Sequence, residues 1–173
     1  AKMIAIEISS MKNFMSKLLA SDAFDCFLLE EAVISTVNTF TIDGHINEDF
    51  FAGREDESPY PASYEGFRPW SEIRNFCFDL IKGKRTPLFF RFVLHLMPEK
   101  ALALLARENC DIDPSQLKAL VLTIRYDGAK AMLTTGTSFH TFLLSKEPDR
   151  IWDKAMLKYL DGKEIAYTGG DNL

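Results

Sequence analysis

The sequence predicts an α+β fold in a single domain that spans residues 1–173. In residues 3–8 and 88–96 the apolar side chains alternate with a period of two, which is typical of strands. In residues 11–19 and 98–109 they recur three or four positions apart, which is typical of helices with one buried face. A chain of 173 residues is long enough to bury an ordinary core without disulfides or a metal.

The first half of the chain contains strand-like and helix-like segments and one irregular stretch. Ser10 is of a type that caps helices, and an amphipathic helix follows it. Asp43-Gly44 follows a β-branched and aromatic run and predicts a tight hairpin turn, because such turns need positive φ. Residues 52–68 have no apolar period, so we expect a long loop there. In chain order we expect strand, helix, strand, turn, loop and helix at 3–8, 10–20, 27–42, 43–44, 52–68 and 69–82.

The second half contains a similar succession of elements. Pro98 suits the first turn of a helix, where its missing N–H is not needed. Asp127-Gly128 predicts a second hairpin turn, and Gly136 predicts a third turn before a last strand. In chain order we expect strand, helix, strand, turn, strand, turn, strand and helix at 88–96, 98–109, 117–126, 127–128, 129–135, 136–138, 139–144 and 148–160.

The likeness of the two halves predicts a tandem duplication. A shift of 84 residues places Asp43-Gly44 on Asp127-Gly128, and an Arg-x-Trp triplet stands near the end of each half. Self-similarity at a fixed period indicates a repeated structural unit, here β-α-β-β-(β)-α. The alternative is an α+β domain in which similar elements recur by chance. The two pseudo-repeats would be residues 3–84 and 88–163.

A β-α-β-β-β unit used twice in one domain resembles the fold of the DNA processivity clamps. The resemblance rests on element order over most of the chain. It implies paired antiparallel sheets with helices packed on one face, in rings of domains that encircle DNA. The helices that would face DNA, residues 10–20 and 98–109, are only weakly basic. DNA encirclement therefore does not carry over from the resemblance.

Two stretches of the chain carry a second resemblance. The segments "NTFTIDGHINEDFF" and "CFDLIKGKRTPLFF" are similar to an uncharacterised family of small bacterial proteins, one of the domains of unknown function. This resemblance implies no activity, so function has to be sought in motifs and in side-chain chemistry.

Motif searches give no catalytic or metal-binding signature. The chain has no GxSxG, P-loop, GxGxxG or HExxH pattern. Gly44 could be the turn glycine of a calcium loop, but Thr39, Thr41 and Phe50 stand where carboxylate ligands are needed. The three cysteines are widely spaced and match no zinc pattern. We therefore expect no metal and no cofactor, and the balance favours a protein that is not an enzyme.

Two groups of side chains are candidate binding residues. Aromatic side chains in and after the 52–68 loop offer the rigid contact area that is typical of interfaces. They are Tyr60, Tyr64, Phe67 and Trp70. The run "KGKRT" follows a helix end, where cations complement the helix dipole, and it is also a short candidate phosphate-binding patch. Its cations are Lys82, Lys84 and Arg85.

Charge and hydropathy narrow the environment of the protein. A net charge of −5 argues against broad nucleic-acid binding, which depends on neutralisation of phosphates by Lys and Arg. No apolar run approaches the ~18 residues of a membrane span, and residues 1–12 lack the apolar core of a signal peptide. We expect a cytoplasmic protein without membrane contact, and the oligomeric state stays open.

The leading functional hypothesis is a non-catalytic protein-interaction or scaffold domain with an unidentified protein partner. One alternative is a clamp-like nucleic-acid accessory protein. The other is a small enzyme whose site assembles from dispersed residues such as Asp43, His45, His95 and His140. This last hypothesis predicts a cleft in which at least two of these side chains meet and have perturbed pKa values.

Overall fold

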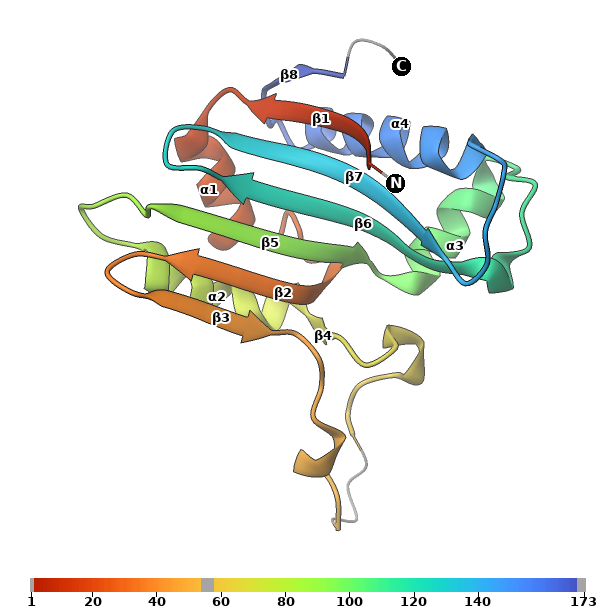
Figure 1. Ribbon diagram of the computed structural model, residues 1–173, viewed down its shortest axis with the longest axis horizontal. Coiled ribbons are helices and arrows are strands. Elements are labelled where there is room, and N and C mark those ends of the chain that lie inside the picture. Colours follow the sequence, from red (N-terminus) through yellow and green to blue (C-terminus); the bar gives the residue numbers. More distant parts are fainter. Residues whose placement is uncertain (1, 54–57, 171–173) are drawn as a thin grey trace.

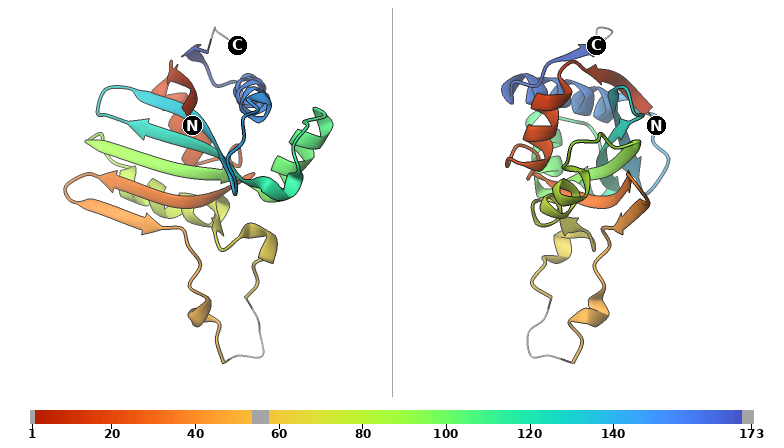
Figure 2. Two further views of the ribbon diagram at one scale, coloured as in Figure 1. Left: turned by 45° about the vertical axis from the view of Figure 1, so that its right-hand side comes forward. Right: turned by 90° about the vertical axis from the view of Figure 1, so that its left-hand side faces the viewer.

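The protein is built from a twisted antiparallel sheet with helices against one of its faces (Figure 1, Figure 2). The computed structural model describes residues 2–53 and 58–170. Its strands are β1 (Lys2–Ile8), β2 (Phe27–Ser35), β3 (Thr39–Asp43), β4 (Arg68–Pro69), β5 (Phe89–Leu96), β6 (Leu117–Tyr126), β7 (Ala131–Phe139) and β8 (Tyr167–Gly169). Its α-helices are α1 (Met11–Leu19), α2 (Trp70–Ile81), α3 (Pro98–Arg107) and α4 (Glu147–Gly162).

In the described residues all the strands belong to one eight-stranded sheet. The order is β3-β2-β5-β6-β7-β1-β8, and β4 pairs with β2. Four α-helices on an antiparallel sheet confirm the α+β prediction. None of the described helices is both long enough and apolar enough to cross a bilayer.

The alternation within each strand decides which face is covered by helices. On β5, Phe90, Phe92 and Leu94 are buried in the core, as the period of two predicts. Arg91 and His95 project from the opposite face, where Arg91 forms an ion pair with Glu31 of β2. Short local signals also act as expected: the Ser10 side chain caps α1 by accepting from the N–H of Asn13 at 3.4 Å.

Two tryptophans fasten helices to the rest of the core. Trp70 at the start of α2 donates its indole N–H to the carbonyl of Leu18 at 3.1 Å. Trp152 on α4 donates to the carbonyl of Val121 at 2.9 Å. Both side chains are buried, and each ring needs a polar partner for its N–H in the interior. These hydrogen bonds help to set the position of α2 against α1 and of α4 against β6.

Two predicted turns are wrong. The β2–β3 turn lies at residues 36–38, and Asp43-Gly44 instead marks the point where the chain leaves the sheet. A Cβ on Gly44 would lie 1.9 Å from the carbonyl oxygen of Leu29, so this glycine permits a close backbone approach. Gly136 lies inside β7 because that strand pairs on both sides, with β6 and β1. The predicted strand at 139–144 is wrong beyond Phe139, where β7 ends.

The clamp-like arrangement is also wrong. The described strands form one sheet, whereas a clamp domain requires paired sheets. In addition, α1 packs against α2 and α3 packs against α4, so the two helices expected to lie together are separated. The tandem duplication stays a prediction. Its corresponding strands β1 and β5 have different neighbours in the sheet, since β1 lies between β7 and β8 and β5 lies between β2 and β6. The sheet topology therefore does not support the resemblance to the clamp fold.

Candidate functional site

A long excursion from the edge of the sheet is the most prominent feature of the surface (Figure 1). We call residues 44–67, between β3 and β4, the arm; residues 54–57 lie outside the described part of the chain. It includes the predicted loop, which the sequence placed at 52–68. Two short 3-10 helices, η1 (Glu48–Phe50) and η2 (Ala62–Tyr64), give it local structure.

The two stems of the arm are joined to each other and to the sheet by backbone hydrogen bonds. The N–H of Gly44 donates to the carbonyl of Glu30 at 2.8 Å. The N–H of Arg68 donates to the carbonyl of Gly44 at 3.0 Å, and that of Ile46 donates to Gly66 at 2.7 Å. The base of the arm is therefore held to the edge of the sheet by regular backbone hydrogen bonds.

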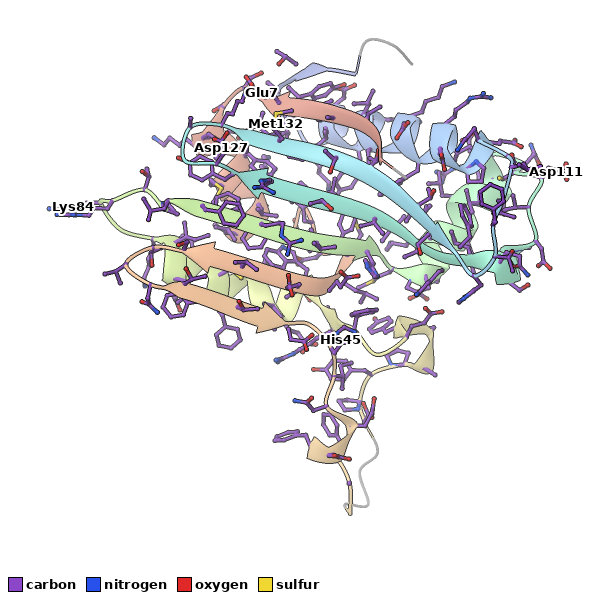
Figure 3. All side chains as sticks on the ribbon, in the orientation of Figure 1. Glu7, His45, Lys84, Asp111, Asp127 and Met132 are labelled. Carbon is purple, nitrogen blue, oxygen red and sulfur yellow. The ribbon has the colours of Figure 1, made fainter. Side chains whose placement is uncertain are left out.

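Three aromatic rings in contact also stabilise the base of the arm. The Phe67 ring lies between two imidazoles, with centroid distances of 4.5 Å to His45 and 4.8 Å to His95. Asp43 Oδ1 lies 2.6 Å from His45 Nδ1, and Glu30 Oε1 lies 2.8 Å from His95 Nε2. The backbone N–H of His45, and then its imidazole, lower the pKa of the Asp43 carboxyl. Each imidazole is thus oriented by a carboxylate, with His45 at the junction of arm and sheet (Figure 3).

The return stem is tied to helix α2 by a shared carboxylate. Glu72 accepts from the Tyr60 hydroxyl at 2.6 Å and from Arg68 Nε at 2.9 Å. Burial and the bond to Glu72 raise the pKa of Tyr60, so the phenol stays protonated as the donor. The ring of Tyr60 in turn contacts Phe51, with centroids 6.3 Å apart.

The outer part of the arm exposes apolar surface. Phe50 packs edge-on against Phe51 at a centroid distance of 5.2 Å, yet its side chain is 71% exposed. Glu48 and Asp49 beside it are also exposed. Phe142 and Leu144, after β7, are also exposed, but Phe50 differs from them in lying next to a second aromatic ring on a projection with a braced base.

A cavity of about 240 Å³ lies between the arm, β5 and α3. Tyr64 and Phe67 line it from the arm, and His95 and His140 line it from the sheet and the segment after β7. The fold thus brings His95 and His140 to one cavity, with His45 on the other side of the Phe67 ring. Two histidines and an orienting glutamate can bind a polar ligand or transfer a proton there.

The predicted binding residues do not form one surface. Tyr60, Tyr64 and Phe67 belong to the arm and are half-buried within it. Trp70, the first residue of α2, is fully buried, so it is a core residue and not a contact residue. Sequence reasoning did not select Phe50 and Phe51 as binding residues, because they precede the 52–68 loop in which it looked for contact residues. The adjacent pair of phenylalanines directly before a polar loop was the available signal.

The predicted cationic patch lies elsewhere, after the end of α2. Lys82, Lys84 and Arg85 are not buried, and Lys84 projects from the connection to β5 (Figure 3). Lys82 Nζ lies 3.0 Å from an Asp79 carboxylate oxygen and above the Phe78 ring. Among the residues that the structure describes, no group of three or more His, Cys, Asp or Glu side chains is arranged to hold a metal.

The comparison with known families covers the arm, the cavity and the strands β2 to β7 of the sheet. A family model described as "Family of unknown function (DUF5721)" matches residues 17–168. The chain belongs to this family. No curated protein and no solved structure matches it. The predicted resemblance to a domain of unknown function is confirmed, and the arm is part of the DUF5721 region because residues 44–67 lie within the match.

Proposed function

We propose that this DUF5721 protein is a non-catalytic interaction domain that captures a protein partner with its arm. The observation that carries the proposal is the exposed Phe50 on the outer part of an arm whose base is braced by hydrogen bonds and by ring contacts. A braced base lowers the entropy lost on association, and buried aromatic anchors dominate interface energies. Glu48 and Asp49 flank this anchor, so the complementary partner surface is an apolar pocket with a basic rim.

Photocrosslinking in living cells tests this proposal and identifies the partner in the same experiment. The full chain carries a benzophenone amino acid in place of Phe50 and, as the matched control, in place of Val37, which is 99% exposed in another turn. We expect a discrete protein adduct from position 50 and not from position 37. Identical adduct patterns at the two positions would contradict a specific contact at the arm.

The identified partner then allows a quantitative test. Phe50→Ser should weaken its affinity for the purified protein by at least about tenfold, as expected for an interface anchor. Val37→Ser should leave the affinity unchanged. Both side chains are exposed, so neither substitution should alter folding.

A second candidate function is a small enzyme that uses the cavity lined by His95 and His140. The observation that favours it is the bond between Glu30 and His95, because a carboxylate that orients an imidazole is a common general-base arrangement. With an activated ester such as p-nitrophenyl acetate, His95→Asn should lower kcat/KM by about 10²-fold. The control His45→Asn, on the other side of Phe67, should not. Equal rates for the two variants would exclude this role of His95.

A further inference from the structure

A second concave site lies on the helical side of the molecule, away from the arm. A groove of about 560 Å³ runs between α1, the end of α2 and the neighbouring ends of β5 and β6. Helices α1 and α2 pack against each other beside it (Figure 2). Its walls are mainly apolar and include Met15, Leu19, Ile81, Phe90 and Tyr126. Its size and apolar lining are those of a small-molecule site.

The charged side chains that line this groove are all cationic. Lys12 comes from α1, and Lys82 and Arg85 come from the connection after α2. In the part of the chain that the structure describes, no Asp or Glu lines the groove, although the whole chain carries a net charge of −5. Within the described residues Lys82 is paired with Asp79, whereas neither Lys12 nor Arg85 has an ion-pair partner. Two cations are thus available for an anionic group.

The apolar lining also includes groups that can adapt to a chain-like ligand. Met11 and Met15 are half-buried on α1, and thioether side chains adjust their shape to irregular apolar surfaces. Phe78 lines the groove from α2 and is 41% exposed. Covering this aromatic ring would remove apolar surface from water, which is the main driving force of such binding.

We propose that this groove binds a single-chain anionic amphiphile of the long-chain carboxylate class. The alkyl chain would lie along Met11, Met15 and Phe78, whose side chains are accessible in the groove. The carboxylate would accept hydrogen bonds from Lys12 and Arg85. Charge-assisted bonds between guanidinium or ammonium groups and a carboxylate are the strong class of hydrogen bond. The site is independent of the interaction assigned to the arm, so either proposal can fail without the other.

Isothermal titration calorimetry with sodium dodecanoate, below its micelle concentration, tests the proposal on the full chain. We expect saturable one-site binding. The affinity should rise from octanoate to dodecanoate by up to about fourfold per methylene, from the transfer free energy of each buried CH₂. Dodecanol, which has the same chain without the charge, should bind at least about tenfold more weakly.

Three variants separate the groove from general attraction of anions. The double charge reversal Lys12→Glu with Arg85→Glu, and the groove-filling Ser16→Trp on α1, should each weaken dodecanoate binding at least about tenfold. The matched control is Lys154→Glu with Lys158→Glu on α4, which reverses the same charge at exposed positions outside the groove. It should leave binding unchanged, and thermal unfolding followed by circular dichroism shows that each variant folds.

Four results would overturn the proposal. They are the absence of saturable binding, equal binding of dodecanol and dodecanoate, equal losses in the α4 control, and binding to anionic phosphatidylglycerol vesicles but not to monomeric dodecanoate. The last result would identify a membrane surface as the target of these cations.

Discussion

Thr135 on β7 donates its hydroxyl proton to the buried carboxylate of Asp153 on α4, at a distance of 2.6 Å. One turn earlier on α4, Asp149 accepts a similar bond from Thr137 at 2.7 Å. The helix therefore turns two carboxylates towards the sheet. Burial raises the pKa of Asp153, and the nearby Asp149 adds to this effect while the bond from Thr135 opposes it.

The substitution Asp153→Asn should stabilise the protein at neutral pH. A folded-state pKa above the unfolded value means that the ionised carboxylate costs stability, and the cost grows as pH rises through the folded pKa. An amide oxygen can still accept the Thr135 bond, and the like-charge pair on α4 disappears. We expect the free energy of unfolding in urea to rise on the order of 1 kcal/mol at pH 7. This gain should vanish below about pH 4, where the unfolded carboxyl is protonated. A gain that is independent of pH would contradict the assignment.

The substitution Thr135→Val should destabilise the protein, although the two side chains have similar shapes. The hydroxyl donates to Asp153 and accepts from the N–H of Ile4 at 3.3 Å, so valine leaves both groups without that partner. We expect a loss of about 2 kcal/mol at pH 7. The loss should be smaller in Thr135→Ser, which keeps the hydroxyl. Equal stabilities of the valine and serine variants in urea would show that the hydrogen bonds contribute little.

Gly44→Ala should displace the arm and destabilise the sheet edge. The added Cβ would lie 1.9 Å from the carbonyl oxygen of Leu29, so the backbone has to shift. We expect the free energy of unfolding to fall by about 2 kcal/mol or more, with faster amide exchange in the arm. The control Gly162→Ala meets open space at the end of α4 and should raise stability by up to about 1 kcal/mol. Similar effects of the two substitutions would contradict the close-approach argument.

Cys77 should be inert towards alkylating reagents in the folded protein. Burial raises the pKa of its thiol to about 12, so at pH 8 the thiolate fraction is roughly 10³-fold below that of a free cysteine. Mass spectrometry after brief treatment with iodoacetamide should find Cys77 unmodified, with modification after denaturation in urea. Rapid native modification of Cys77 would show that the core around α2 opens readily.

Local chemistry decided which parts of the fold could be predicted. The cap at Ser10 and the two faces of β5 depend on neighbours in the sequence, so their patterns were sufficient. A turn was wrongly expected at Asp43-Gly44, because the position of the turn is set by the pairing of β2 with β3. The glycine at position 44 is required instead by its close approach to the carbonyl of Leu29, which is distant in the sequence. The continuation of β7 through Gly136 depends likewise on partners on both sides.

The candidate site was predictable only in part, for the same reason. The irregular composition of the arm marked it as a loop with aromatic contact residues. The meeting of His45 and His95 across Phe67 has no counterpart in the sequence, because it requires β5 to lie beside the base of the arm. Burial of Trp70 was equally invisible, since an amphipathic helix start and an exposed loop end look alike.

Strands β3 and β4 both pair with the same edge of β2, so together they form a single edge strand that the arm interrupts. The 3.0 Å bond between the N–H of Arg68 and the carbonyl of Gly44 closes the excursion at its base. Each doubling of the length of a loop whose ends are already joined costs only about 0.6 kcal/mol. The excursion can therefore be shortened, lengthened or exchanged for a foreign peptide while the β-sheet scaffold is kept, which makes this position suitable for grafting new recognition segments.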